Sequence, residues 1–238
     1  MEKLAEVNIR PLRIAFDHFE MKDIYVKAIR TAAKFGIRDL SNYLLYNFKD
    51  KPEHLYERMK INVDLCEELG VSIYSFPMKY HPIDDPEWCH NRDYIGEPHW
   101  NRKFIRAIQA VLNATKGKIG RGKSFFEEAF GRDLAEFNKI LWMPEAFIIY
   151  RRKYDADLRK RLSARYDLHI EGESDKANEW WEKFCELSSE QLARVKQIIA
   201  SNRFTDEDIE VDDEQIKEIL RYYQIKRDEE STTGEKNG

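Results

Sequence analysis

The amino-acid sequence predicts an α/β protein in which about three parallel strands alternate with helices and an all-helical region follows. Two observations lead to this class. Short apolar runs centred near Ile14, Leu44 and Ile73 recur roughly every 30 residues, the length of a strand–helix–strand unit. Beyond about residue 100, apolar residues follow helical spacing only. Strands joined through helices of this length run parallel, with right-handed crossovers.

Residues 11–16, PLRIAF, predict the first strand, which Asp17 closes. The segment DIYVKAIRTAAKFG predicts the next helix, because its apolar residues recur at helical spacing and Gly36 follows as a stop signal. The apolar residues at this spacing are Ile24, Ala28, Ala32 and Phe35.

Residues 42–48, NYLLYNF, predict the second strand. The segment DKPE then predicts a capping box, with Asp50 as N-cap, Pro52 in the first turn and Glu53 three residues after the cap. The helix HLYERMKINVDLCEELG carries one apolar stripe and ends at Gly70. Residues 71–77, VSIYSFP, predict the third strand.

The chain divides by character into four parts. We expect residues 1–83 to form the strand–helix region, 84–100 a loop, 101–226 the helical region and 227–238 a polar, disordered tail. Within the helical region Trp180 and Trp181 are adjacent, so they cannot face the same way on a helix. We therefore expect one of the two rings to lie in the core.

Bulk composition restricts the function classes. Hydrophobic residues make up 42% of the 238 residues, and the net charge of -4 gives no overall attraction to nucleic acid or anionic membrane. No apolar run approaches the ~20 residues that span a bilayer, and the N-terminus lacks the order of a signal peptide. We therefore expect a cytoplasmic protein.

Residues 117–124, GKIGRGKS, match the P-loop pattern G-x-x-x-x-G-K-S. A working P-loop leaves a buried strand and opens a helix, so that backbone N–H groups converge on phosphate oxygens. The residues before it, RAIQAVLNATK, have helical periodicity instead. We interpret the segment as a helix–helix connection and keep nucleotide binding only as a third alternative.

No metal site is predicted. The spacing of Cys66, Cys89 and Cys185 matches no zinc or iron–sulfur motif. The loop containing His81, His90 and His99 also fits no ligand template, so we interpret its histidines as solvated.

Four segments taken together resemble the carboxyl-terminal part of a radical S-adenosylmethionine (SAM) protein. They are RPLRIAFDH, SNYLLYNFKDKPEHLYERMKINVDLCEELGVSIYSFPMKYHPI, RDYIGEPHWNRKFIRAIQAVLN and GKSFFEEAFG with FNKILWMPEAFIIYR after it. The resemblance covers roughly residues 8–151. It implies a partial (β/α) barrel of radical SAM type, with the three strands as the fourth, fifth and sixth of that barrel.

In that family these strand ends line the nucleoside side of the SAM site. The resemblance implies that Asp17 reaches ribose hydroxyls, that amide groups of asparagines contact the nucleoside, and that residues 76–78 contact adenine. The implied cofactor-binding residues are Asp17, Asn42, Tyr46, Asn47, Phe76, Pro77 and Met78.

The sequence departs from the family in its defining element. It contains no C-x-x-x-C-x-x-C loop, whose thiolates hold the four-iron four-sulfur cluster, and PLRIAF begins only ten residues after Met1. We therefore expect a fragment or split subunit that shares a SAM site but is not catalytic alone. Because three parallel strands cannot close a barrel, the expected partner is a cluster-bearing half-barrel subunit or a second copy.

The main alternative is a non-enzymatic interaction or RNA-binding protein. Residues 151–165, RRKYDADLRKRLSAR, concentrate cations that can contact phosphates. Salt-dependent RNA retention would favour this alternative if it disappeared when four arginines were neutralised: Arg151, Arg152, Arg159 and Arg161.

Overall fold

The computed structural model describes residues 2–7, 9–84, 86, 94–120, 122–150, 170–202 and 211–224. The chain divides into two compact units, Met1–Leu141 and Trp142–Gly238. The division therefore falls later than the loop at 84–100, and the helices up to residue 141 belong with the sheet. The predicted tail (227–238) and the basic run (151–165) lie outside the described residues.

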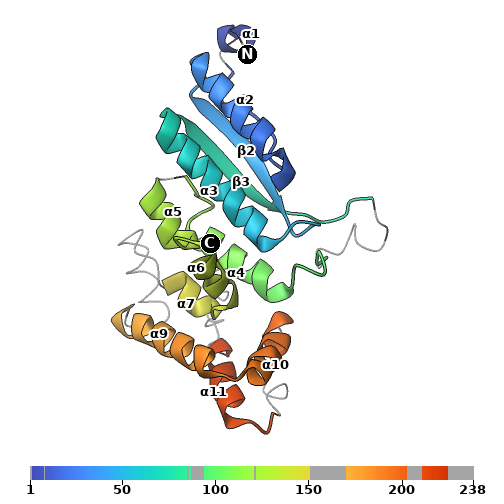
Figure 1. Cartoon of the computed structure of the whole chain (residues 1–238), viewed down its shortest axis with the longest axis vertical. Helices are drawn as coiled ribbons and strands as arrows, with labels where there is room; N and C mark the ends of the chain where they lie inside the picture. The colour runs from blue at the N-terminus through green and yellow to red at the C-terminus, as the bar shows by residue number, and fades with distance from the viewer. Residues whose placement is uncertain are drawn as a thin grey trace, which may run out of the picture. The chain divides into compact units, whose positions relative to one another are not determined.

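The first unit contains a three-stranded parallel sheet, as the sequence predicts. Its strands β1 (Leu12–Arg13), β2 (Asp39–Tyr46) and β3 (Ser72–Lys79) are hydrogen-bonded in the order β1-β2-β3. Figure 1 shows β2 and β3 side by side. β1 is shorter than the predicted run. In the register of β2 and β3, Asn42 pairs with Ser75 and Tyr43 pairs with Phe76.

Two helices cover the same face of this sheet. After α1 (Glu2–Glu6) and the 3₁₀ turn η1 (Phe19–Met21), α2 (Lys22–Lys34) connects β1 to β2, and α3 (Pro52–Leu69) connects β2 to β3. Asn42 Nδ2 donates to Tyr25 Oη of α2 at 2.8 Å, and Asn62 Nδ2 of α3 donates to Ser75 Oγ at 2.8 Å. Because Asn42 and Ser75 are register partners, their side chains share one face, so both helices lie on it.

The buried face of α2 is not formed by the apolar residues whose spacing predicts the helix. The residues that pack inward are Tyr25, Ile29, Ala32 and Ala33. Of the residues at helical spacing, Ala32 is buried, whereas Ile24 is 73% exposed and Phe35 is 45% exposed. Tyr25 decides the orientation of the helix, because its ring stacks on Phe16 at 4.1 Å and its hydroxyl meets Asn42.

The start of α3 also differs in its cap. The N-cap residue is Lys51, with no hydrogen bond from its side chain, so the predicted capping box is wrong. Asp50 turns back instead, and its Oδ1 accepts from the Phe48 N–H at 3.1 Å. The end of the helix is as predicted, because Gly70 has the left-handed conformation, φ 59°.

The described residues of the first unit also form α4 (Arg102–Ala114), α5 (Lys123–Phe130) and α6 (Leu134–Trp142), the last of which ends one residue beyond the unit. α4 ends at Ala114 and α5 begins at Lys123, so residues 117–124 are preceded by a helix and not by the strand that a P-loop requires. The Lys123 N–H at the start of α5 donates to the carboxylate of Glu67 at 2.9 Å. A side chain of α3 therefore takes a donor that a phosphate would need.

The second unit is helical: α7 (Glu145–Tyr150), α9 (Ile170–Glu186), α10 (Ser189–Ala200) and α11 (Glu214–Tyr223). Trp180 is fully buried, whereas Trp181 is half-buried and stacks on Phe184 at 5.8 Å, so one ring of the pair lies in the core as predicted. Among the described helices of both units, none combines the length and the apolar character that crossing a membrane requires.

Candidate functional site

In the described part of the chain, the face of the sheet opposite α2 and α3 carries exposed aromatic side chains. Tyr43, Tyr74, Phe76 and Met78 point to this face and are 37%, 47%, 38% and 45% exposed. The Phe76 ring lies 5.6 Å from the Tyr43 ring and 4.4 Å from the Tyr74 ring. We call this surface the open face, and it is unusual because large apolar side chains on a sheet normally pack against another layer.

A cation borders the open face on β1. The guanidinium of Arg13 lies 4.8 Å from the centre of the Tyr43 ring, and its Nε donates to Ser41 Oγ at 3.4 Å. Arg13 and Ser41 are register partners, so both belong to this face. The open face therefore offers flat aromatic surfaces next to a fixed positive charge, which suits a planar ring attached to polar groups.

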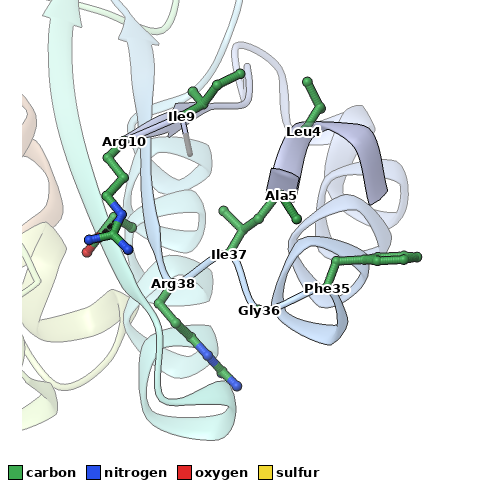
Figure 2. A pocket seen from close by; sticks show the side chains of 9 residues that line it. Leu4, Ala5, Ile9, Arg10, Phe35, Gly36, Ile37 and Arg38 are labelled. Atoms are coloured by element: carbon green, nitrogen blue, oxygen red, sulfur yellow. Dashed lines mark ion pairs between the residues drawn. The ribbon is translucent and has the colours of Figure 1, made fainter. Parts of the chain in front are cut away.

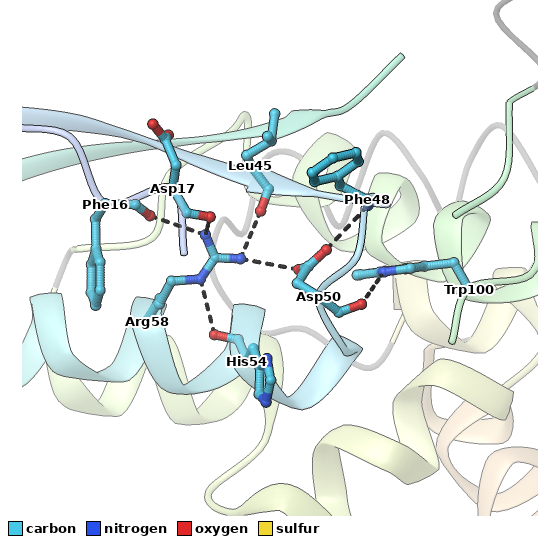
Figure 3. A network of polar contacts seen from close by, with 8 residues as sticks. All are labelled: Phe16, Asp17, Leu45, Phe48, Asp50, His54, Arg58 and Trp100. Carbon is cyan, nitrogen blue, oxygen red and sulfur yellow. Dashed lines mark hydrogen bonds and ion pairs between the residues drawn. The ribbon is translucent and has the colours of Figure 1, made fainter. Parts of the chain in front are cut away.

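A buried arginine holds together the carboxyl ends of β1 and β2 (Figure 3). Arg58 of α3 has a fully buried side chain. Its Nη1 donates to the carbonyls of Phe16 and Asp17 at 3.0 and 2.7 Å, and its Nη2 donates to the carbonyl of Leu45 at 2.6 Å. Three backbone carbonyls on two chain segments therefore receive hydrogen bonds from one side chain.

Asp50 completes this network. Its Oδ2 accepts from Arg58 Nη2 at 3.1 Å, and its carbonyl accepts from Trp100 Nε1 at 2.7 Å. Burial raises the pKa of the Asp50 carboxyl, against the opposing effects of the Phe48 N–H and the Arg58 guanidinium. Burial likewise lowers the pKa of Arg58. The pair is a structural clamp, since its donors and acceptors are directed at the protein itself.

Asn47 ties a later segment to the end of β2. It has a left-handed backbone, φ 68°, and its Nδ2 donates to the carbonyls of Tyr80 and Tyr94 at 3.2 and 2.9 Å. Its Oδ1 accepts from the Gly96 N–H at 2.9 Å. A Cβ on Gly96 would lie 2.4 Å from the Phe48 carbonyl oxygen, so the two segments touch through their backbones.

Aromatic rings continue along the same end of the sheet. The Phe48 ring lies 6.4 Å from His18 and 4.3 Å from Tyr80, and the Tyr80 ring lies 5.5 Å from Tyr94. Burial, with a smaller contribution from Tyr80, raises the pKa of Tyr94. These rings follow β1, β2 and β3 at their carboxyl ends, where parallel sheets usually hold ligands.

The structure separates the residues expected to contact SAM. Phe76 and Met78 lie on the open face. Asp17 lies at the end of β1, half-buried, and Figure 3 shows its side chain directed away from the Arg58 guanidinium. The remaining four are on the helix-covered side or in turns that bind other parts of this chain: Asn42, Tyr46, Asn47 and Pro77.

Three of these four residues are buried and contact other parts of the chain, and Pro77 is half-buried. Asn42 and Asn47 use amide hydrogens on Tyr25 and on backbone carbonyls. Tyr46 is buried with its ring 5.5 Å from Trp100, and burial raises its pKa to about 12. Pro77 is the register partner of Leu44, which is fully buried beneath the helices. Contact with a nucleoside stays a prediction best supported for Asp17, Phe76 and Met78.

Sequence reasoning missed Arg58 and Tyr43. A signal for Arg58 was present, because it lies three residues after Leu55 and four before Asn62, on the inward side of α3. A cation on a buried helical face needs several acceptors, and the carbonyls at strand ends are the nearest source. Tyr43 gave no comparable signal, because strand alternation does not say which face stays uncovered.

Within the described part of the chain, no group of three or more His, Cys, Asp or Glu side chains is placed to hold a metal ion. Comparisons of the chain with protein-family models, with curated proteins and with solved structures gave no match.

Proposed function

We propose that this chain supplies the nucleoside-facing wall of a SAM site in a radical SAM-type (β/α) barrel, with the iron–sulfur ligands lying outside the chain. The observation that carries the proposal is the open face. Three parallel strands follow one another in chain order, both crossover helices lie on one side, and the other side exposes aromatic residues.

This arrangement is what an arc of a (β/α) barrel requires. In such a barrel every helix packs on the outer surface, and the opposite side of each strand faces the interior. A doubly wound sheet has helices on both sides instead. The open face therefore corresponds in geometry to a barrel interior, and its rings correspond to interior side chains that line a ligand site.

Each side chain has a specific part in the proposed site. The ring of Phe76 stacks on adenine, and the thioether of Met78 packs against the edge of the purine. The carboxylate of Asp17 accepts hydrogen bonds from ribose hydroxyls. Reductive cleavage of SAM, the chemistry of the family, needs an electron from a cluster, and the three cysteines of this sequence lack the motif that holds one.

The proposal can be tested on the chain alone with S-adenosylhomocysteine and adenosine as probes. With ¹³C-methyl-labelled methionine, the Met78 signal is one of five and reports binding at the open face. We expect a saturable shift with a Kd on the order of 1 mM, because half a site provides only part of the contacts.

Phe76→Ser is the test variant and Phe35→Ser is the matched control. Both residues are phenylalanines with similar exposure, 38% and 45%, but Phe35 adjoins α2 on the helix-covered side. Loss of the shift in the first variant and its retention in the second would support the proposal. No saturable shift of Met78, or equal shifts in both variants, would refute it.

An interaction protein without enzymatic activity is the second candidate, and the same open face favours it, since exposed apolar patches commonly mark protein interfaces. The nucleoside titration separates the two. Failure to bind either probe would leave the open face as a protein-binding surface.

A further inference from the structure

The open face continues past the side chains that the SAM proposal uses. Strand register arranges its residues in rows across the sheet: Arg13, Ser41 and Tyr74 are successive register partners, and Tyr43 and Phe76 form the next row. Of these five residues, only Phe76 has a part in the SAM proposal. The row of Arg13 precedes Phe76 in the direction of the strands, so a molecule bound over this row lies beside the nucleoside and not in its place.

The guanidinium of Arg13 is held in position but has hydrogen-bond donors left. Its Nε donates to Ser41 Oγ at 3.4 Å, and its Cζ lies 4.8 Å from the centre of the Tyr43 ring. Among the described residues, no carboxylate forms an ion pair with Arg13, and its two Nη groups make no hydrogen bond. A guanidinium with free Nη groups matches the paired oxygens of a carboxylate or a phosphate.

Two other arginines near the start of β2 are already engaged. Arg10 Nε lies 3.9 Å from Asp39 Oδ2, and Arg38 Nη1 donates to the Leu69 carbonyl at 2.6 Å. Both arginines line a cavity of about 120 Å³ (Figure 2). Because Asp39 already pairs with Arg10, it does not neutralise Arg13. The charge of Arg13 therefore remains available to a ligand on the open face.

We propose that the substrate of the site is a planar aromatic ring that carries an anionic group, either a carboxylate or a phosphate. This inference rests on the proposed function, because it names the molecule that binds beside the nucleoside. The anionic group pairs with the Nη groups of Arg13, and the ring packs against Tyr43 and Tyr74. The Phe76 ring lies 5.6 and 4.4 Å from these two rings, so the substrate ring and the adenine are neighbours on one aromatic surface.

The charge of Arg13 decides between classes of ligand. A cationic ligand is repelled by the guanidinium. An apolar ligand that covers Arg13 removes water from the charge without replacing it, which costs free energy. A neutral aromatic molecule contacts the rings but leaves the Nη groups without an anion. Only an aromatic anion uses the rings and the guanidinium together.

Three naphthalene derivatives test this inference on the full chain. Naphthoate and naphthyl phosphate carry the two candidate anions, and naphthamide is the neutral control of nearly the same shape. Ligand-observed NMR titration gives the dissociation constants. We expect a Kd on the order of 1 mM for the better anion and about tenfold weaker binding of naphthamide. The tighter of the two anions identifies the group that the substrate carries.

Arg13→Gln is the test variant and Arg10→Gln is the matched control. Both change an arginine at the same edge of the sheet, but only Arg13 lacks a carboxylate partner among the described residues. Arg13→Gln should weaken binding of the anion by about tenfold and leave that of naphthamide unchanged, which also checks that the variant is folded. Arg10→Gln should change neither. Tyr74→Ser should weaken both ligands, because it removes ring surface that both use.

The possible results separate this inference from the SAM proposal. Equal wild-type affinities for the anions and naphthamide overturn the inference, as does an equal loss in Arg10→Gln and Arg13→Gln. Displacement of the anion by adenosine overturns it too, because the two molecules are expected to bind together. An adenosine shift of Met78 without any preference for the anions leaves the SAM proposal standing. Arg13-dependent binding of an anion without an adenosine shift refutes the SAM proposal and supports an aromatic anion as the ligand of the open face.

Discussion

Replacing Arg58 by methionine removes the clamp at the carboxyl ends of β1 and β2. The change leaves the Asp50 carboxylate buried without its cation, and it deprives the carbonyls of Phe16, Asp17 and Leu45 of their donor. Breaking one side of a buried ion pair costs about 3–5 kcal/mol. Each buried carbonyl left without a donor adds about 1 kcal/mol or more unless water reaches it. We expect a loss of at least about 4 kcal/mol, a large share of a typical stability of about 5–15 kcal/mol.

Arg30→Met is the matched control. The distance from Nη2 of arginine to the nearest carboxylate oxygen is 3.0 Å for Arg30 with Glu68 and 3.1 Å for Arg58 with Asp50. The side chains of the first pair are 52% and 50% exposed, whereas those of the second are 0% and 7% exposed. An exposed pair contributes about 0–1 kcal/mol. The two variants therefore compare ion pairs of nearly equal distance, one about half-exposed and the other buried.

The assay is urea unfolding followed by ¹⁹F NMR of the chain labelled with fluorotryptophan. Trp100 donates to the Asp50 carbonyl and so reports on the first unit directly, separately from unfolding of the second. Asp50→Asn combined with Arg58→Met should be less destabilising than the sum of the single changes. A loss below about 1 kcal/mol for Arg58→Met, or one equal to that of Arg30→Met, would refute the reasoning.

Three further predictions concern the same end of the sheet. Asn47→Ala removes three hydrogen bonds and a residue that tolerates φ 68°, so it should lower the unfolding free energy by about 3 kcal/mol. Asn47→Gly should lower it by less, because glycine adopts this φ without strain. Equal urea midpoints for the two variants would argue against backbone strain. Gly96→Ala should lower the melting temperature, because its Cβ would lie 2.4 Å from the Phe48 carbonyl oxygen; an unchanged melting temperature would contradict that close approach. Because the pKa of Asp50 is raised, the folded state binds the proton of this carboxyl more tightly than the unfolded state does. The stabilisation that Asp50 contributes is therefore present below about pH 4 and is lost as the pH rises through the folded-state pKa. Unfolding free energies measured against pH should therefore fall less steeply for Asp50→Asn than for the wild type, and parallel curves would show that Asp50 does not titrate in this way.

Element types in the first unit were predictable because they depend on local patterns. The strand–helix alternation, the stop at Gly70 and the helix before residues 117–124 are consequences of spacing and of residue preferences within short windows. The parallel order of the strands also follows, since helical crossovers leave few other topologies.

Side-chain roles at the candidate site were less predictable. The order Asp50, Pro52, Glu53 matched a capping box, but Asp50 turns toward Phe48 and Arg58 because a buried guanidinium needs a counter-charge more than the helix needs a cap. Asn42 and Phe76 both lie in predicted strands, yet one faces the helices and the other the open face. A shift of one residue in strand phase exchanges these roles.

The amino-acid sequence by itself determined that this protein has parallel strands joined by helices, because the periods of its apolar residues and its helix end signals act over a few residues at a time. Only the tertiary structure decided which face of the sheet stays open, which side of α2 packs inward and which carboxylate pairs with Arg58. Those outcomes depend on contacts between residues far apart in the chain, such as Tyr25 with Asn42 and Arg58 with Phe16. A local pattern is compatible with several such pairings, and the packing of the whole unit selects one of them.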